Sequence, residues 1–501
     1  MSCLIGIDLG TSSLRSMLVS EDGEVKALSA RSYQFASPHN GYAEHDPEKW
    51  WQACLETLRE VLHTQVDTKE EVRGLSFSGQ MHGLVMLDSK FHVVRPAILH
   101  CDARSSDQVE ELKGLLGEGR IRDIIMNPVY TGFLLPSLMW VKEKEPENFA
   151  RIAHVMLPKD YLKFKLTGEI STDYSDASAT LAFDIRRNCW SREVLDLAGI
   201  PIEWFPPCYD TAAAVGTVCK KTAEETGLRM GVIVCAGGGD QVMQGIGNGA
   251  VHEGDACSNI GTSGQVSFQS GLPICNPFLN TNTFCGYKKG RWFTMGAIMN
   301  AGLSYKWFSS LFETVDYDKM NEKIAKVPPG SGGVIFLPYL NGERTPHLNP
   351  NISGAFVGLN VNTGRTQMAR AVMEGVAFAL NQCIEVCSGL GLSAQSMIAS
   401  GGAARSMPWL QIQSDIFDLP LRTAENEEQA SLGAAIAAGV GSGVYRDIEE
   451  GCSRAVRYKD FIVEPSRENH RIYQEYYQLF KDMYNEGRGV IERLTLLGRR
   501  E

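Results

Sequence analysis

The stretch IDLGTS at residues 7–12 has a counterpart in NIGTSG at residues 259–264, which repeats its Gly-Thr-Ser core. Each copy follows an extended run and precedes another, a pattern that predicts a strand, a tight turn and a second strand. The repeat is short, but one copy stands near the start of each half of the chain. A duplicated strand-turn-strand hairpin predicts two related domains that face each other.

Strands and helices alternate outward from these two hairpins. Predicted strands cover residues 4–8, 16–20, 72–78, 84–87 and 232–236. Helical spacing covers residues 47–62 with Asp46 as the N-cap, most of 108–197, residues 409–417 and a long stretch, 471–497. This mixture predicts an α/β fold, in which open sheets hold ligands at the carboxyl ends of their strands.

The size and charge of the chain limit its class. A length of 501 residues favours two domains, because a single hydrophobic core rarely extends over so long a chain. The formal net charge of -11, with acidic and basic residues interspersed, argues against nucleic acid as a partner. It does not exclude a nucleotide, which needs only local hydrogen bond donors.

The cysteines and the apolar segments predict a cytoplasmic protein without a membrane anchor. The 13 cysteines are scattered singly, with neither a CxxC pair nor a zinc-type spacing with histidine, which predicts reduced, buried thiols. The amino end runs directly into the first predicted strand, without the basic and apolar regions of a signal peptide. The longest apolar stretch, residues 433–444, is rich in glycine and too short to cross a bilayer.

The two Gly-Thr-Ser turns are suited to phosphate binding, because glycine lets a ligand approach the backbone while amides and hydroxyls supply donors. The predicted phosphate ligands are Gly10, Thr11, Ser12 and Ser13 in the first turn and Gly261, Thr262 and Ser263 in the second. Either turn alone favours an ordinary hairpin. The two together favour a nucleotide clamped between two domains.

Asp8 ends the first predicted strand, directly before the first turn. A carboxylate at such a buried position is costly unless it is paired or binds a cation. The position therefore predicts a magnesium site, largely through water because magnesium keeps much of its hydration shell. The alternative is an aspartate that caps the turn.

Three consecutive glycines deliver a second carboxylate at the end of a strand. Gly237-Gly238-Gly239-Asp240-Gln241 follows the predicted strand at residues 232–236. The glycines leave space for a ligand, and Asp240 is the predicted general base that accepts the proton of an attacking hydroxyl. The alternative, a glycine-rich turn with Asp240 as the N-cap of a helix, is equally compatible with the sequence.

Further polar turns extend the candidate site. Gly401 and Gly402, with Ser406, lie between a predicted strand and a helix, which suits a nucleobase or ribose as well as close packing. His82 stands in the loop 79–83 between two strands, where a ligand contact is more typical than a core position. The turn GERTPH at residues 342–347 contains a Glu-Arg pair that is interpreted as structural.

With these motifs in hand, the chain resembles the FGGY carbohydrate kinases over nearly its whole length. The matching motifs, in order, are GIDLGTSS at 6–13, SGQMHG at 78–83, LPKDYLKFKLTGE at 157–169, TDYSDAS at 172–178, GGGDQ at 237–241, NIGTSG at 259–264 and FLPYLNGERTPH at 336–347. Residues 354–374 fit the second signature of the family. Individually some of these motifs are weak, but their order is highly specific.

The resemblance implies an actin-like ATPase core, with two ribonuclease H-like domains flanking a deep cleft. Residues 1–247 would form the domain that binds the sugar and carries the base, and residues 248–501 the domain that binds ATP and ends in the long helix. Asp8 resembles the magnesium-associated acid of the family and Asp240 its catalytic base. The residues that resemble sugar contacts are Gln80, Met81, His82 and Gln241, and those that resemble further nucleotide contacts are Gly302, Gly401, Gly402 and Ser406.

The loop 80–82 and the GERTPH turn most resemble members that phosphorylate xylulose, so the expected reaction converts D-xylulose and ATP to D-xylulose 5-phosphate and ADP. L-xylulose, ribulose, glycerol and gluconate are alternative acceptors, because Gln241 and the strand end His100-Cys101-Asp102 depart from the usual pattern. Ser137, where the first signature usually has lysine, is interpreted as structural. A chaperone-type or regulatory member of the same fold is the alternative from another class, and dimerisation through the long helix is left open.

Overall fold

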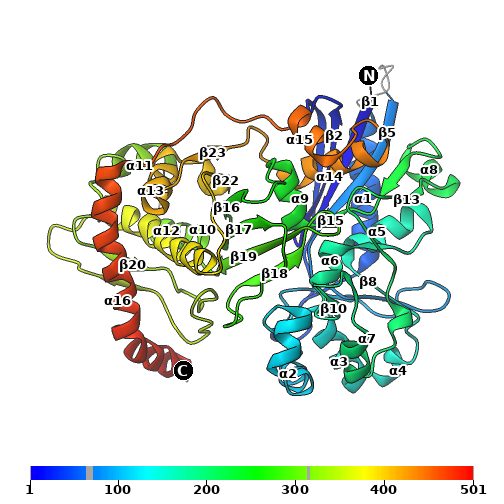
Figure 1. Ribbon diagram of the computed structural model, residues 1–501, viewed down its shortest axis with the longest axis horizontal. Helices are drawn as coiled ribbons and strands as arrows, with labels where there is room; N and C mark the ends of the chain where they lie inside the picture. Colours follow the sequence, from blue (N-terminus) through cyan, green and yellow to red (C-terminus); the bar gives the residue numbers. More distant parts are fainter. Residues whose placement is uncertain (1, 64–70, 313–315, 500–501) are drawn as a thin grey trace.

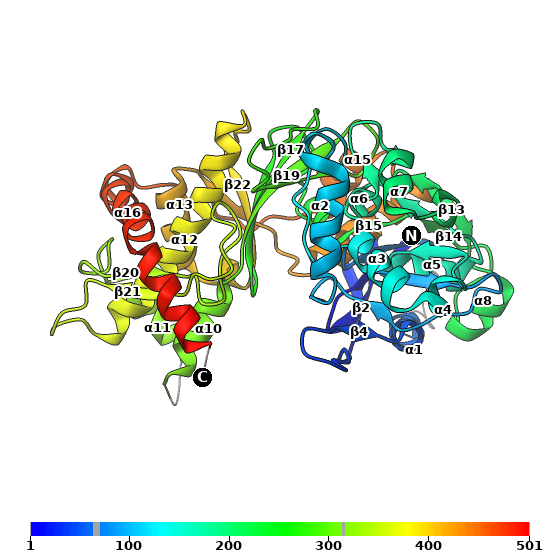
Figure 2. The same ribbon diagram turned by 90° about the horizontal axis from the view of Figure 1, so that it is seen from below.

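Two central sheets organise the chain, and the computed structural model describes residues 2–63, 71–312 and 316–499. Figures 1 and 2 show the elements gathered into two lobes around these sheets, with α16 at the outer edge of the second lobe. We call the first sheet and the elements packed on it the first lobe, and the second sheet with its helices the second lobe.

The first sheet has the strand order β13-β14-β5-β1-β2-β3, with β15 also paired to β5. Its strands are β1 Ser2–Leu9, β2 Ser13–Ser20, β3 Val25–Ser32, β5 Glu71–Gly79, β13 Ala214–Thr217, β14 Ile233–Cys235 and β15 Gly238–Gly239. Strand β1 runs antiparallel to β2 and parallel to β5, and β14 is parallel to β5. The ends of β1, β5 and β15 therefore meet at one edge of the sheet, where the first Gly-Thr-Ser turn lies.

The second sheet repeats this arrangement with the order β18-β19-β17-β16-β22-β23. Its strands are β16 Ala256–Ile260, β17 Gly264–Ser270, β18 Asn282–Cys285, β19 Trp292–Ile298, β22 Met397–Gly401 and β23 Leu421–Thr423. The series β3-β2-β1-β5-β14 and β19-β17-β16-β22-β23 agree in order and in direction. The internal repeat predicted from two short motifs is thus confirmed over two five-strand units.

Helices and short strands surround these sheets. In the first half they are β4 Glu44–His45, α1 Pro47–His63, β6 Val85–Leu87, β7 Ala97–Ile98, α2 Ser106–Arg120, α3 Leu134–Lys144, α4 Pro146–Phe149, β8 His154–Met156, α5 Pro158–Thr167, β9 Thr172–Asp173, α6 Tyr174–Ser178, α7 Arg192–Ala198, α8 Lys220–Thr226 and α9 Asp240–Gly247. In the second half they are α10 Gly302–Ser310, α11 Tyr317–Ile324, β20 Ile335–Leu337, β21 Ala355–Val357, α12 Arg365–Gly389, α13 Met407–Phe417, α14 Gln429–Gly441, α15 Ile448–Ala455 and α16 Arg467–Gly498. Asp46 caps α1 as predicted, since its Oδ1 accepts from the Glu48 amide at 3.0 Å.

Helices α14 and α15 return to the first lobe, although they come late in the sequence. Figure 1 shows them, in orange, beside the blue strands β1 and β2. Helix α14 lies so close to β1 that a Cβ atom added at Gly6 would be 1.8 Å from the Ser431 carbonyl oxygen. Helix α15 packs on α14, so both helices belong to the first lobe although they lie beyond the proposed division after residue 247.

The long carboxyl-terminal helix packs on the second lobe. Helix α16 buries one face, formed by Tyr473, Tyr477, Phe480 and Tyr484, against α12, α13 and β20. This confirms the predicted helix and the lobe on which it packs. Among the residues that the structure describes, no helix is both long and apolar enough to cross a membrane.

Candidate active site

The two Gly-Thr-Ser turns form matching hairpins at the ends of β1 and β16. In the first, the Gly10 amide donates to the Ser13 carbonyl at 2.9 Å, and in the second the Gly261 amide donates to the Ser263 carbonyl at 3.0 Å. Ser12, Thr262 and Ser263 are exposed at the two tips. Amides and hydroxyls of both turns are thus open to a ligand, as phosphate binding requires.

The two hairpins differ in the polar side chain that precedes them. Asp8 pairs with Ser78 across β1 and β5, whereas Asn259 pairs with Ser400 at the equivalent position of the second sheet. The Ser78 hydroxyl donates to Asp8 Oδ1 at 2.7 Å, and an Arg15 nitrogen lies 4.0 Å from Asp8 Oδ2. Burial raises the pKa of Asp8, while Ser78 and Arg15 act against that rise. Only the first hairpin therefore carries an acid beside its turn.

Asp240 is the first residue of α9, and Gly239, not Asp240, is the N-cap. The N-cap alternative for Asp240 is therefore wrong. The preceding glycines form β15, in which Gly238 lies beside Ser78 and Gly239 beside Gly79. A Cβ atom at Gly239 would be 2.8 Å from Met81 Cγ, so only glycine allows this close approach.

The two predicted acids lie on either side of the end of β5. Burial first, and then the negative charge of Asp8, raise the pKa of Asp240 to about 7, while hydrogen bonds from Gln241 act against the rise. A pair of carboxyl groups in which the pKa of one is raised to near physiological pH is typical of acid-base catalysis. A carboxyl with this pKa can exchange a proton with a hydroxyl near physiological pH.

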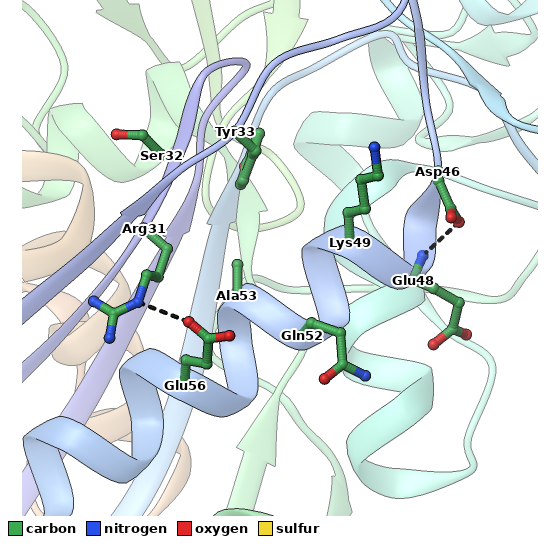
Figure 3. A pocket seen from close by; sticks show the side chains of 9 residues that line it. All are labelled: Arg31, Ser32, Tyr33, Asp46, Glu48, Lys49, Gln52, Ala53 and Glu56. Atoms are coloured by element: carbon green, nitrogen blue, oxygen red, sulfur yellow. Dashed lines mark hydrogen bonds and ion pairs between the residues drawn. The ribbon is translucent and has the colours of Figure 1, made fainter.

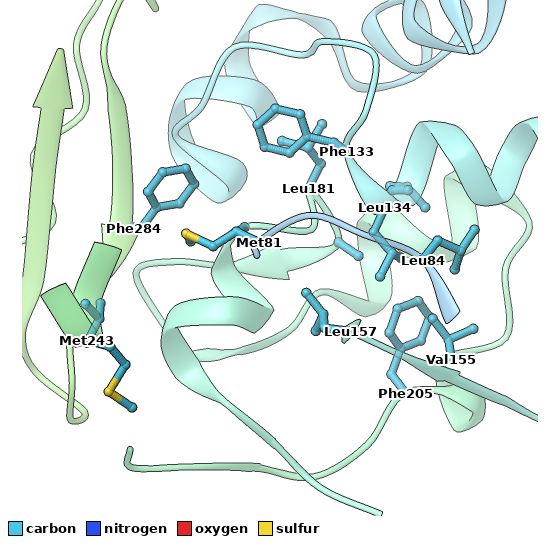
Figure 4. Packing of buried hydrophobic residues seen from close by; sticks show 14 of the residues in the cluster. Met81, Leu84, Phe133, Leu134, Val155, Leu157, Leu181, Phe205, Met243 and Phe284 are labelled. Carbon is cyan, nitrogen blue, oxygen red and sulfur yellow. The ribbon is translucent and has the colours of Figure 1, made fainter. Parts of the chain in front are cut away.

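The loop 79–83 places its three polar or sulfur-containing side chains differently. Gln80 is buried, and its Oε1 accepts from the Thr11 hydroxyl at 3.3 Å, which ties it to the first hairpin. Met81 is buried and points toward Phe284 and Met243, as Figure 4 shows. Packing therefore accounts for much of the environment of Met81.

His82 is held in a fixed orientation. Its φ is 71°, its Nδ1 lies 2.7 Å from the Ala179 carbonyl oxygen, and its ring lies 4.2 Å from that of Phe133. Burial lowers the pKa of His82 to about 3. The ring is therefore neutral, Nδ1 donates to Ala179, and Nε2 is left as an acceptor for a ligand hydroxyl.

Gly302 and the paired glycines of β22 border the second hairpin. The Gly302 amide donates to the Gly261 carbonyl at 2.9 Å, and a Cβ atom at Gly302 would be 2.3 Å from that oxygen. Gly401 has a φ of 77° and lies against Ile260, and Gly402 is exposed. Ser406 is buried and caps α13, so its predicted nucleotide contact would compete with the cap.

The comparisons with known proteins now identify the family. Residues 3–247 match the N-terminal domain of the FGGY family of carbohydrate kinases, and residues 256–442 match its C-terminal domain. The chain belongs to the FGGY family of carbohydrate kinases. Membership confirms the predicted carbohydrate kinase, with ATP as the phosphoryl donor and a sugar as the acceptor.

Relatives of this FGGY kinase span its whole length. A xylulose kinase of Bacillus subtilis (strain 168) is 36% identical over 485 residues, which cover 97% of each chain. The crystal structure of a xyloylose kinase from Brucella ovis is 31% identical and superposes with a TM-score of 0.92, covering 97% of this chain and 100% of that one. The xylulose kinase of Rhodospirillum rubrum superposes with a TM-score of 0.91 at 28% identity, covering 98% and 99% of the two chains. The predicted actin-like ATPase fold is thereby confirmed.

One predicted sugar contact of the kinase is occupied by the other lobe. The Gln241 Oε1 atom accepts from Gln265 Nε2 at 2.6 Å, which joins α9 to β17. The sequence analysis does not single out Gln265, because the residue follows the NIGTSG motif in β17 and nothing in the sequence indicates that its side chain faces Gln241. A sugar that used Gln241 would have to share or displace this contact.

Glu343 and Arg344 of the GERTPH turn have different surroundings. Glu343 Oε1 accepts from the amides of Met299 and Arg344, and burial raises the pKa of Glu343 to about 8. The charge of Arg344 acts against the raised pKa of Glu343 and, across the lobes, adds to the lowering of the pKa values of His82 and His100 by burial. Glu343 thus anchors the turn, and the exposed Arg344 faces the candidate site.

A separate groove of about 400 Å³ lies between β3 and α1 (Figure 3). Acidic and basic side chains line it, including Arg31 paired with Glu56 at 2.8 Å. It contains none of the predicted site residues. It is linked to them through Ser32, which lies opposite Ser13, and through Tyr33, whose hydroxyl donates to the Gly10 carbonyl at 2.7 Å.

Proposed function

We propose that this FGGY kinase transfers the γ-phosphoryl group of ATP to a terminal hydroxyl of a ketopentose, with D-xylulose as the substrate. The observation that carries the proposal is the position of Asp240, directly after β15 and across the end of β5 from Asp8 and the first hairpin; its pKa of about 7 agrees with this role. The names and full-length similarity of the relatives support xylulose as the acceptor.

In the proposed reaction, the Asp240 carboxylate accepts the proton of the acceptor hydroxyl. The hydroxyl oxygen forms a bond to the γ-phosphorus as the bond to the oxygen bridging the β- and γ-phosphorus breaks, and ADP leaves with that oxygen. Such transfers depend mainly on positioning and charge stabilisation. The turns at residues 10–13 and 261–263 would hold the phosphates, with Ser12, Thr262 and Ser263 exposed at their tips.

The chemistry around Asp8 fits a magnesium ion. One carboxylate oxygen accepts from Ser78 at 2.7 Å, and the other has Arg15 only at 4.0 Å, so it can take part in a hydrated magnesium site. Bound magnesium would neutralise phosphate charge. Asp8 would hold it, partly through water.

Sugar and nucleotide would occupy opposite sides of the phosphate group. Gln80, His82 and Gln241 supply polar atoms on the side of the first lobe, and Met81 an apolar wall. Gly302, Gly401, Gly402 and Ser406 are the proposed nucleotide contacts on the second lobe. The exposed Arg344 is a further polar group for the sugar side.

The substrate is tested by a panel of acceptors in an assay that couples ADP release to a spectroscopic signal. D-xylulose, L-xylulose, ribulose, glycerol and gluconate are compared at equal concentration. We expect the highest kcat/KM for D-xylulose, and a higher value for another member of the panel would assign the kinase to that acceptor instead.

The role of Asp240 is tested by Asp240→Asn, which keeps size and polarity but cannot accept the proton. Loss of a general base typically lowers kcat by about two to four powers of ten. ATP binding, measured by titration calorimetry, should be retained. Near-normal turnover of the variant would refute the assignment.

Compartment and assembly complete the proposal. We propose a cytoplasmic location, in which the 13 free cysteines would stay reduced. A homodimer through α16 is proposed on the exposed apolar residues Val490, Leu494 and Leu497 of that helix. Sedimentation analysis of the chain with Leu494→Glu would test it, with a change to monomer expected.

A further inference from the structure

Five charged side chains are buried together behind the candidate active site. They are Lys159, Asp160, Lys163, Asp173 and Asp176, and their side chains are at most 1% exposed. We call them the buried ionic cluster. Lys159 Nζ lies 2.7 Å from Asp160, 2.8 Å from Asp173 and 3.1 Å from Asp176, and Lys163 Nζ lies 2.9 Å from Asp160.

Stability alone does not explain the buried ionic cluster. Burial opposes the charge on Lys159, but the three carboxylates raise its pKa well above the ordinary value, so the ammonium group stays charged. Burial also raises the pKa of Asp176 well above its usual range. Ion pairs in such surroundings are often no more stable than apolar side chains of similar volume. Their position in the lobe is therefore more informative than their energy.

The cluster first supports the loop that carries Gln80, Met81 and His82. A Cβ atom added at Gly79 would lie 2.7 Å from Lys159 Cβ, and one at Gly83 would lie 2.7 Å from Pro158 Cγ. The first turn of α5 is thus in direct contact with both ends of this loop. Movement of Lys159 would be transmitted to it, because packed interiors leave little free volume.

The cluster also holds the segment that leads to Asp240, at two points. Lys163 Nζ donates to the Ala236 carbonyl at 2.9 Å. The Gly239 amide donates to Ser175 Oγ at 3.0 Å, and the Ser175 hydroxyl in turn donates to Asp173. Both bonds are buried, so water cannot replace them without a change in packing.

We propose that the buried ionic cluster, acting through Lys163 and Ser175, positions the glycine segment so that Asp240 meets the acceptor hydroxyl. The inference rests on the proposed role of Asp240. Ser175 is a positioning residue: it touches the backbone of Gly239 and no reacting atom. A displacement of about 1 Å in such a segment can lower a rate by about 100-fold.

The test is Ser175→Ala, which removes the acceptor of the Gly239 amide, with Ser178→Ala as the matched control. Ser178 lies on the same short helix and is equally buried; its Oγ accepts from the Cys285 amide at 3.0 Å, and its hydroxyl donates to the Ser175 carbonyl at 2.7 Å, so it makes no bond to the glycine segment itself. Both variants lose one buried hydrogen bond acceptor for an amide. Both should therefore lower the melting temperature to a similar extent.

We expect Ser175→Ala to lower kcat by about 10- to 100-fold with an unchanged KM for ATP, because only alignment is lost. Ser178→Ala should keep kcat within about twofold, since its bond does not reach Asp240. Equal kcat values for the two variants would overturn the proposal. If Ser175→Ala does not fold, Ser175→Cys, a weak acceptor of similar shape, gives the same comparison.

Asp240→Asn separates this proposal from the proposed function. If Asp240→Asn is inactive while Ser175→Ala and Ser178→Ala have equal kcat values, Asp240 is the base and the buried ionic cluster does not position it. If Asp240→Asn retains normal turnover, the base assignment fails, and positioning through Asp240 fails with it. Selective loss of kcat in Ser175→Ala, together with an inactive Asp240→Asn, supports both.

Discussion

The surroundings of Asp240 raise the pKa of its carboxyl group to near physiological pH. Burial and the charge of Asp8 raise its pKa to about 7. A general base acts only when ionised, so kcat/KM for the sugar should fall about tenfold per unit as the pH drops below 7 and level off above it. Measurement at saturating ATP from about pH 5 to about pH 9 checks this, with the ionisation of ATP itself as a separately measured control. An acid limb near pH 4 would contradict the role.

The same rise in pKa means that the ionised form of Asp240 destabilises the folded protein at high pH. Its pKa rises from 3.8 to about 7 on folding, so the stability present below pH 3.8 is lost as the pH rises through 7. The side chain of Asp240→Asn cannot ionise, so the free energy of unfolding of this variant at pH 8 should exceed that of the wild type by up to about 4 kcal/mol. At pH 4 the two proteins should have equal free energies of unfolding. Denaturant titrations at both pH values test this, and an equal difference at both would show that ionisation is not responsible.

At the scale of elements, the crossing of α9 and α14 joins the two halves of the chain. A Cβ atom at Gly433 would lie 1.9 Å from the Met243 carbonyl oxygen, and one at Gly247 would lie 1.8 Å from that of Gln429. Gly433→Ala must push the helices apart and should destabilise the protein by about 1 to 3 kcal/mol. Gly114→Ala in α2, with no atom within 4 Å of the added methyl group, should be neutral or stabilising. Equal melting temperatures for the two variants would contradict the argument.

Elements that are determined by neighbouring residues in the chain could be predicted from the sequence. The Gly-Thr-Ser turns, the capped α1 and the glycine segment before Asp240 each depend on residues adjacent in the chain. The sequence of helix α14 shows only a short, glycine-rich apolar stretch, because no local pattern indicates which sheet the helix covers. Lys159 and Lys163 belong to the motif at residues 157–169 that resembles the family. Lysine and aspartate are usually exposed, so the sequence does not predict that these side chains are buried. The fold alone brings Asp173 next to Lys159. Long-range packing therefore set the limit of prediction.

At the scale of the whole molecule, strands β18 and β19 of the second lobe contribute side chains to the apolar core of the first lobe, and polar contacts also cross the junction. Asn127 of the first lobe donates to the Thr283 carbonyl at 2.7 Å and accepts from the Thr283 amide at 3.0 Å. Gln241 and Gln265 make a second bridge at 2.6 Å, next to the proposed base. The Gln241–Gln265 bridge lies next to the proposed base, so a rotation of the lobes about their apolar junction when a ligand binds would change the site directly.

We therefore expect the lobes to close on the sugar before ATP is consumed, because a site open to water would hydrolyse ATP unproductively. Small-angle scattering of Asp240→Asn, which should bind sugar without turning it over, measures the radius of gyration with and without D-xylulose. The radius should decrease with D-xylulose and stay constant with an acceptor that the coupled assay finds inactive. Because the Gln241–Gln265 bridge already spans the junction, Gln265→Ala should open the sugar-free form and enlarge the change. An unchanged radius on sugar binding in both proteins would mean that the lobes are already closed, and that water is excluded by the sugar alone.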